Sequence, residues 1–182
     1  MTLVMSTGLI GSGKDTFADY IEENHGFAKV VFSEVLNKML RKEGIEVNRE
    51  NQQKYREEHG SDFLAKATVE EIQTLKSESN DKFVISGPRK LSDYFIPKKK
   101  LDDDVWLVLI EADEEKRWKR LKSRGGPKDE NLTKKKFDAQ EKKEFELYDF
   151  DKLFKLADFK ISNNKTKKDF FRKIDKIMEE IK

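Results

Sequence analysis

Five short runs of apolar residues alternate along the chain with longer segments of helical periodicity. Each run is about as long as a strand and lacks strict polar alternation, which is typical of strands buried on both faces of a parallel sheet. The apolar runs are residues 3–7, 28–32, 83–86, 105–111 and 157–162. The helical segments include residues 15–24, 33–43, 113–124 and 167–181. This alternation predicts an α/β protein with about five parallel strands between two layers of helices.

Two segments interrupt this alternation. Residues 45–80 are polar and of helical period over a long stretch, so we expect a helical insertion there. Residues 123–130 contain Gly125, Gly126 and Pro127 among charged residues, which predicts a mobile loop.

Length and composition exclude several classes of function. A chain of 182 residues indicates one domain with a sizeable core. The 38 basic residues nearly balance the 36 acidic ones, and the formal net charge of +2 does not indicate a nucleic-acid partner. The absence of cysteine excludes disulfides, thiolate–zinc sites and cysteine nucleophiles. No apolar run reaches the roughly 18 residues of a membrane span, and the N-terminus lacks the pattern of a signal peptide. We therefore expect a cytoplasmic monomer or homodimer without a membrane partner.

The strongest chemical signal follows the first apolar run. Four residues separate Gly8 from Gly13, and Lys14 comes next, which is the spacing of a phosphate-binding loop. Glycines let backbone amides approach phosphate oxygens, and the next helix directs its N-terminal amides at the same anion. The lysine supplies a positive charge. We predict that a nucleoside triphosphate is bound here by Gly8, Gly11, Ser12, Gly13 and Lys14. The alternative is a glycine-rich turn without a ligand.

Asp15 departs from the usual loop, in which a hydroxyl follows the lysine and binds magnesium. Its carboxylate could bind the metal directly or through water. Alternatively, Asp15 is only a first-turn acid that the helix dipole favours. The next residue, Thr16, could contact the α-phosphate. We regard Asp15 and Thr16 as the candidate metal ligands.

These residues, in this order of elements, resemble the nucleoside monophosphate kinase group of P-loop kinases. That group includes adenylate kinase, dephospho-CoA kinase and small archaeal adenylate-kinase-related proteins. The run from Gly11 to Thr16 also resembles the loop of phage deoxynucleotide kinases. The resemblance covers nearly the whole chain and is most specific at the phosphate loop. It implies a P-loop fold, ATP as the phosphoryl donor, Mg²⁺, and a small phosphorylated acceptor.

Residues 84–89 resemble the motif that ends the third strand of these kinases, where an arginine binds the phosphate of the acceptor. A planar guanidinium suits that role because it forms two parallel hydrogen bonds to phosphate. The resemblance therefore assigns Gly87 and Arg89 to acceptor binding, and Arg89 also to catalysis. The alternative is a surface arginine after a turn. Ser86 stands where relatives have an aspartate that helps to hold magnesium, which leaves metal binding by this strand open.

Residues 117–126 resemble the helix that leads into the kinase lid. Arg117, Arg120 and Arg124 are spaced to share one helical face. In relatives, such arginines cover the donor base and stabilise the transferring phosphoryl group, which implies catalytic roles for Arg120 and Arg124. The alternative is a solvated basic face.

Residues 137–144 resemble the returning lid helix. Gln140 stands where the family has an arginine. Lys142 or Lys143 could supply the missing charge, although lysine lacks the fork geometry of arginine.

The remaining candidates concern the two substrates. Residues 157–164 resemble the last strand of the family and the loop that frames adenine, which implies donor binding by Asn163; the alternative is an ordinary turn. Ser33 is a plausible N-cap at the carboxyl end of the sheet, where α/β proteins bind ligands. Because Asn37 replaces an arginine of the family, acceptor recognition could shift to Arg41 or Arg56. The alternative for both is a surface helix charge.

The sequence thus predicts a single P-loop kinase domain. Its core comprises residues 1–32, 81–119 and 146–182, its acceptor-binding arm residues 33–80, and its lid residues 120–145. The predicted reaction is ATP-dependent phosphoryl transfer to a small phosphorylated acceptor, with a nucleoside monophosphate as first choice. Two alternatives remain: a kinase for dephospho-CoA or a polynucleotide end, and a nucleotide-binding regulatory module with weak turnover. The replacements at Ser86, Asn37 and Gln140 support the second.

Overall fold

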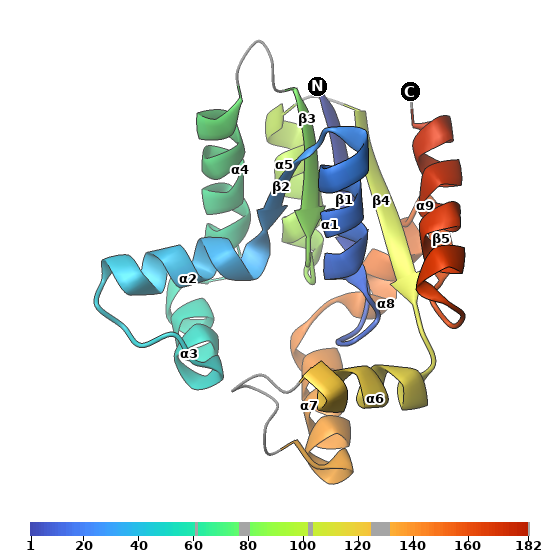
Figure 1. Ribbon diagram of the computed structural model, residues 1–182. Coiled ribbons are helices and arrows are strands. Elements are labelled where there is room, and N and C mark those ends of the chain that lie inside the picture. The colour runs from blue at the N-terminus through green and yellow to red at the C-terminus, as the bar shows by residue number, and fades with distance from the viewer. Residues whose placement is uncertain (61, 77–80, 102–103, 125–131, 182) are drawn as a thin grey trace.

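A parallel five-stranded sheet forms the centre of the molecule. The computed structural model describes residues 1–60, 62–76, 81–101, 104–124 and 132–181. The strand order is β2-β3-β1-β4-β5, with neighbours paired in parallel (Figure 1). The strands are β1 Thr2–Thr7, β2 Ala28–Val31, β3 Lys82–Ser86, β4 Asp104–Glu111 and β5 Phe159–Ser162. The predicted α/β fold with about five parallel strands is therefore confirmed.

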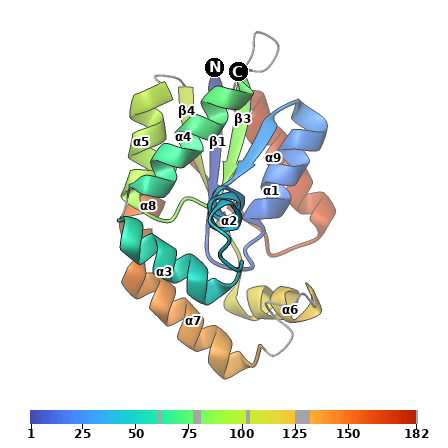
Figure 2. The ribbon, with the colours of Figure 1, turned by 90° about the vertical axis from the view of Figure 1, so that its left-hand side faces the viewer.

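Helices cover both faces of this sheet and extend beyond one of its ends. They are α1 Lys14–His25, α2 Phe32–Lys42, α3 Arg49–His59, α4 Phe63–Leu75, α5 Leu91–Leu101, α6 Glu114–Arg124, α7 Lys134–Leu147, α8 Phe150–Leu153, the 3-10 turn η1 Phe154–Leu156 and α9 Lys167–Glu180. Helices α1 and α9 lie on one face, and α4, α5 and α8 lie on the other (Figure 2). No helix in the described part of the chain is both long and apolar enough to cross a membrane.

The central strand shows why apolar runs without alternation form this sheet. Leu3 and Met5 are fully buried in the apolar cluster on the α4–α5 face, whereas Val4 is fully buried in the cluster on the α1–α9 face. Successive side chains of a strand point to opposite faces, so a strand covered on both sides needs apolar residues at every position.

The segment 45–80 differs from the predicted polar insertion. It forms two helices, and α3 is polar except for the buried Tyr55. Helix α4 buries Leu64, Val69 and Ile72, and it packs against α5 on the face of the sheet. The prediction of a wholly polar segment was wrong for α4. Charged residues stand between its apolar positions in the sequence, so the apolar face of the helix was not recognised.

Two further elements differ from expectation. Helix α5 was not predicted, since proline is untypical of a helix interior and Pro97 lies inside this helix. Helix α2 begins at Phe32, and its N-cap is Val31. The prediction that Ser33 is the N-cap was therefore wrong, because Ser33 is the second residue of the helix.

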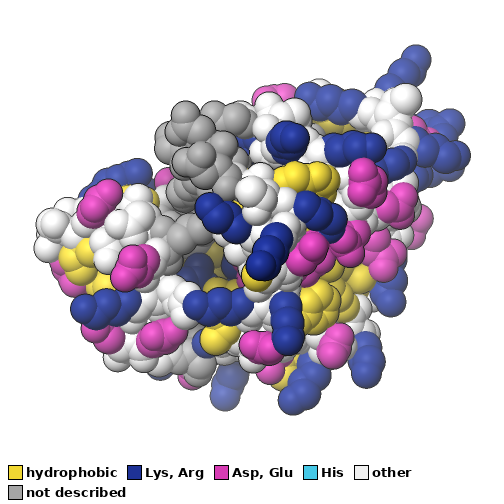
Figure 3. Space-filling view, turned by 90° about the horizontal axis from the view of Figure 1, so that it is seen from below, with side chains coloured by type: hydrophobic (Ala, Val, Ile, Leu, Met, Phe, Trp, Pro, Cys, Tyr) yellow, Lys and Arg dark blue, Asp and Glu magenta, His cyan; other side chains and the backbone are white. Residues whose placement is uncertain are grey.

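One end of the molecule gathers the elements around the carboxyl ends of the strands (Figure 1). These elements are the loop after β1 and helices α3, α6 and α7. Seen from below, this end is hollowed and carries many charged side chains of both signs (Figure 3). Ligands of open α/β sheets bind at this end. The predicted loop at residues 123–130 falls mostly on residues outside the described part of the chain.

Candidate active site

The loop between β1 and α1 has a backbone that only glycine adopts without strain. Gly8, Gly11 and Gly13 have φ angles of 151°, 76° and 103°. The neighbours are also close: a Cβ on Gly11 would lie 2.8 Å from the carbonyl oxygen of Arg117, and a Cβ on Gly13 would overlap the side-chain amide of Asn163. Both the conformation and the packing of the loop therefore require glycine at these positions.

Ser12 lies inside this loop and is fully buried. Its amide donates to the Leu9 carbonyl at 3.1 Å, but its hydroxyl oxygen finds no hydrogen-bond partner among the described residues. A buried polar group without a partner costs on the order of 1–3 kcal/mol. An unsatisfied hydroxyl among positive-φ glycines at a helix N-terminus fits a loop that closes around phosphate oxygens.

Lys14 begins α1 and lines a cavity of about 700 Å³ at the carboxyl end of the sheet. Burial lowers the pKa of its ammonium group, and the nearby Asp15 carboxylate partly opposes this effect. The positive charges of Arg89 and Arg124 lower the pKa further. A polyanion in the cavity would stabilise the charged form of Lys14, which is the property required of a phosphate-binding lysine.

Asp15 and Ser86 meet across the phosphate loop. Ser86, the fully buried last residue of β3, donates its hydroxyl to Oδ1 of Asp15 at 2.5 Å. Strand β3 pairs with β1 so that Ser86 lies opposite Ser6. The hydroxyl of Ser6 donates to the Lys14 carbonyl at 3.1 Å. The end of β3 is thereby coupled to the first turn of α1.

Arg89 lies in the loop after β3 and reaches the cavity. Its backbone amide donates to the buried Asp93 carboxylate at 2.9 Å, and Lys90 does so at 3.0 Å, which holds the loop in place. The guanidinium forms an ion pair with Glu144 at 2.9 Å and lies 5.2 Å from the ring centre of Tyr148. Burial lowers the pKa of Arg89, but Glu144 and Tyr148 outweigh this effect and raise it overall.

The opposite side of the cavity comes from helices α2 and α3. Arg56 on α3 and Ser33 on α2 both line it. Burial lowers the pKa of Arg56, and the positive charge of Arg89 acts in the same direction. Two arginines whose charges repel each other indicate a region that would gain from an anionic ligand.

Arg41 lies outside this cavity, contrary to the prediction that it binds substrate. It is exposed in the last turn of α2, which runs away from the sheet (Figure 1). Arg41 lies eight residues beyond Ser33 on this helix. At 1.5 Å of rise per residue, Arg41 is about 12 Å farther along the helix axis than Ser33. Gly87, also predicted in the acceptor site, has a φ of 95°, and a Cβ on it would lie 3.9 Å from the side chains of Lys14 and Phe32.

Arg120 and Asn163 contact the backbone of the phosphate loop. Arg120 donates to the carbonyl of Asn163 at 2.6 Å, and its second terminal nitrogen lies 3.3 Å from the carbonyl of Gly11. The amide of Asn163 donates to the carbonyl of Ser12 at 2.8 Å. In this geometry both side chains position the loop, since their hydrogen-bonding groups are directed at its carbonyls. Arg124, one turn beyond Arg120, lines the cavity.

The donor set at the loop fits a magnesium ion. The Asp15 carboxylate and the Thr16 hydroxyl are hard oxygen groups, and both residues line the cavity. No cluster of three or more His, Cys, Asp or Glu residues suited to a metal occurs in the described part of the chain. Magnesium in nucleotide sites needs no such cluster, because it usually takes one or two protein carboxylates and completes its shell with water and phosphate.

The comparisons with known proteins agree with this geometry. A family model described as an AAA domain matches residues 4–148. The chain belongs to this family. It has the P-loop NTPase fold, with kinases among its structural neighbours.

Individual relatives match the chain over nearly its whole length. A UPF0200 protein of Thermococcus kodakarensis is 27% identical, covering 98% of this chain and 97% of that protein. A dephospho-CoA kinase from Campylobacter jejuni has a TM-score of 0.60 at 18% identity, over 98% of this chain and 96% of its own. A shikimate kinase from Bacteroides thetaiotaomicron has a TM-score of 0.65 at 10% identity, over 98% of both chains. The likeness to solved structures shows the fold.

This P-loop domain contains site residues that the sequence reasoning missed. Glu144 and Tyr148 line the cavity from α7 and the residue that follows it, and Glu141 forms an ion pair with the buried Arg117 of α6. Arg117 also donates to the carbonyl of Ile10 in the phosphate loop. The spacing of Glu141, Glu144 and Tyr148 by three and four residues was an available signal, since it places them on one face of a helix.

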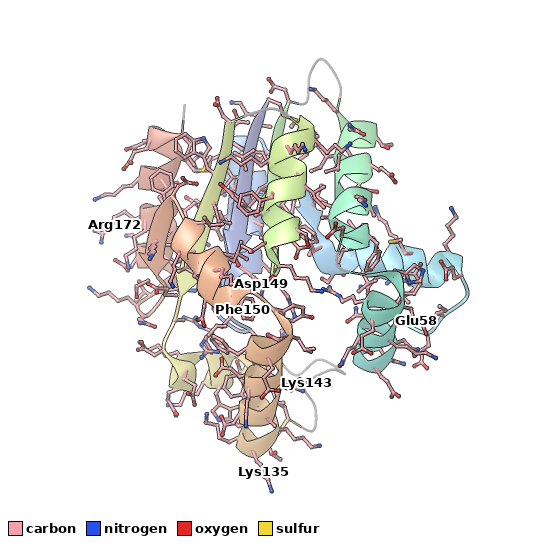
Figure 4. The ribbon with its side chains drawn as sticks, turned by 180° about the vertical axis from the view of Figure 1, so that it is seen from behind. Glu58, Lys135, Lys143, Asp149, Phe150 and Arg172 are labelled. Carbon is pink, nitrogen blue, oxygen red and sulfur yellow. The ribbon has the colours of Figure 1, made fainter. Side chains whose placement is uncertain are left out.

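Helix α7 brings this face toward the sheet at one end only. Figure 4 shows Lys143 at the end nearer the sheet and Lys135 at the far end. From this helix, the residues that line the cavity include Gln140, Lys143 and Glu144. Gln140, which replaces an arginine of the resembled family, has a buried side-chain oxygen without a partner among the described residues.

Proposed function

We propose that this protein transfers the γ-phosphoryl group of ATP to a small phosphorylated acceptor, with a nucleoside monophosphate as the first candidate. One observation carries the proposal: a single cavity of about 700 Å³ is lined by the phosphate loop with Lys14 and also by Arg56 and Arg89. Two cationic groups of residues around one cavity suit two anions that must meet end to end.

On the donor side, the loop amides and Lys14 bind the β- and γ-phosphates. Asp15 and Thr16 are the proposed metal ligands. Magnesium, bound together with ATP, neutralises charge on these phosphates. Arg120 and Asn163 hold the loop in the conformation that binds. In the proposed complex, Asn163 also borders the adenine pocket. Residues 120–145, of which 125–131 lie outside the described part of the chain, are the proposed lid that carries Arg124 over the donor.

On the acceptor side, Arg89 binds the phosphate of the acceptor through its fork of N–H groups. Arg56 and Ser33 complete this half, together with the arm formed by residues 33–80. An acceptor phosphate is already ionised at neutral pH and attacks without losing a proton to the protein. The contribution of the protein is therefore to place two anions in line and to neutralise their charge.

The choice of acceptor is tested directly. The purified protein is incubated with ATP and Mg²⁺ and offered nucleoside monophosphates, dephospho-CoA or 5′-hydroxyl oligonucleotides, and each phosphorylated product is identified by mass spectrometry. We expect turnover with at least one monophosphate. Turnover with dephospho-CoA or an oligonucleotide alone would replace the proposed acceptor but leave the kinase. ATP binding without transfer to any of them would favour the regulatory module.

A further inference from the structure

The pair Asp15–Ser86 contains the two groups that P-loop kinases place at the metal, but on exchanged elements. In P-loop NTPases the hydroxyl follows the lysine of the loop and binds magnesium, and a separate strand-end aspartate assists. Here the carboxylate follows the lysine and the hydroxyl ends the strand β3. The aspartate at position 15 and the serine at position 86 are each unusual when taken alone. Their hydrogen bond explains why the two replacements occur together.

The contact is short and lies at the mouth of the phosphate loop. Ser86 is fully buried, whereas Asp15 is exposed to the cavity that Lys14 also lines. The 2.5 Å hydrogen bond runs from the serine hydroxyl to Oδ1 of Asp15. A donor from the rigid sheet therefore sets the orientation of a carboxylate on the first turn of α1. This hydrogen bond engages Oδ1, so a ligand in the cavity that Asp15 lines can take the second carboxylate oxygen.

We infer that Asp15 and Ser86 exchange the usual roles: the Asp15 carboxylate is the carboxylate ligand to the magnesium of the bound nucleotide, and the Ser86 hydroxyl positions it. This inference rests on the proposed function, since it concerns the metal that accompanies ATP. It assigns Ser86 as a positioning residue that acts through Asp15. The alternative, in which Asp15 is only a first-turn acid, gives Ser86 no part in metal binding.

The first test measures metal binding without turnover. The affinity of a fluorescent, non-hydrolysable ATP analogue is measured with Mg²⁺ and with EDTA, and Mn²⁺ bound in the presence of the analogue is measured by electron paramagnetic resonance. We expect Asp15→Asn to lower the Mn²⁺ affinity by at least about 10-fold, and Ser86→Ala to lower it by about 10-fold, the scale of lost ligands and their hydrogen-bonded supports. The affinity in EDTA should change little.

Two variants control for side effects. Asp19→Asn removes a carboxylate one turn further along α1 that pairs with Lys29, and Thr68→Val removes a fully buried hydroxyl from α4. Both should leave the Mn²⁺ affinity unchanged.

A double-substitution cycle separates positioning from simple disturbance of the loop. If Ser86 acts through Asp15, Ser86→Ala should add nothing to the loss caused by Asp15→Asn. The exchange Asp15→Ser with Ser86→Asp should bind Mn²⁺ more tightly than Ser86→Asp alone, which places two carboxylates in contact. If the exchanged variant does not fold, as judged by circular dichroism, the inference is still tested by Asp15→Asn, Ser86→Ala and their combination.

Three results would overturn the inference: an unchanged Mn²⁺ affinity in Asp15→Asn, an unchanged affinity in Ser86→Ala, or additive losses in the double variant. Nucleotide binding that is indifferent to metal in the unaltered protein would also overturn it while leaving donor binding intact. Absence of any nucleotide binding would instead remove the proposed function, and this inference with it.

Discussion

The two halves of the cavity are built in different ways. On the proposed donor side, the loop between β1 and α1 is held by glycine geometry and by side chains that bind its backbone carbonyls, as Arg120 and Asn163 do. On the proposed acceptor side, Arg89 and Glu144 come from separate elements and bind each other through side chains. A backbone cradle keeps its shape whether or not a ligand is present, whereas a side-chain ion pair must open before an anionic substrate can take its place. The comparison predicts that the half of the cavity at the phosphate loop is preformed and that the half around Arg89 rearranges when a ligand binds.

The largest effect should come from the cation of the preformed half. We expect Lys14→Ala to lower turnover by at least ~100-fold, because the charge on the transferring phosphates loses a partner that is already in place. Steady-state kinetics with the best acceptor measures the loss. Lys160→Ala, an exposed lysine on β5, is the matched control and should retain normal turnover. Near-normal turnover of the Lys14 variant would refute its assignment.

The second prediction concerns Arg117, which links the phosphate loop to helix α7. Arg117 joins α6 to the loop through the carbonyl of Ile10 and to α7 through Glu141. Arg117→Met should lower the free energy of unfolding by about 2 kcal/mol, below the range for a fully buried pair because Glu141 is partly exposed. Urea denaturation followed by circular dichroism measures this change. An effect below about 0.5 kcal/mol would show that the loop does not depend on α7.

A smaller effect is expected where the acceptor half must open. Glu144→Gln removes the carboxylate that competes with an acceptor phosphate for Arg89, so the KM for the acceptor should fall by about 2- to 5-fold, the range of a modest ion pair. Glu146→Gln, an exposed residue on the same helix, should leave the KM unchanged. A rise in KM for the Glu144 variant would mean that Glu144 orients Arg89 and that this half is also preformed.

The smallest effect concerns the arm that carries Arg56. The hydrogen bond to Glu43 raises the pKa of Tyr55 to about 12. The folded protein then holds this proton more tightly than the unfolded chain, so the contribution is complete below about pH 10 and is lost as the pH rises toward 12. The difference in urea midpoint between the unaltered protein and Tyr55→Phe should therefore shrink over that interval. A constant difference would show that the bond does not stabilise the arm.

The sequence predicted the elements whose signals are local. The five strands were recognisable because a strand covered on both sides needs apolar residues at successive positions, as Leu3, Val4 and Met5 show. Helix α5 escaped recognition because Pro97, a residue that disfavours helix interiors, lies within it and tertiary packing overrides this local preference. Helix α4 was misread as polar because its buried positions are separated by charged ones.

The same division applies to the site. By itself the sequence determined the phosphate loop, because its function depends on the backbone freedom of neighbouring glycines and on a lysine at a set spacing. Only the tertiary structure decided that Asp15 meets Ser86, 71 residues away, and that Glu144 meets Arg89, 55 residues away. Such pairs depend on how strands and helices are arranged in space. Spacing along the chain does not encode that arrangement. The sequence singled out Arg89, but its ion pair with Glu144 became visible only in the fold.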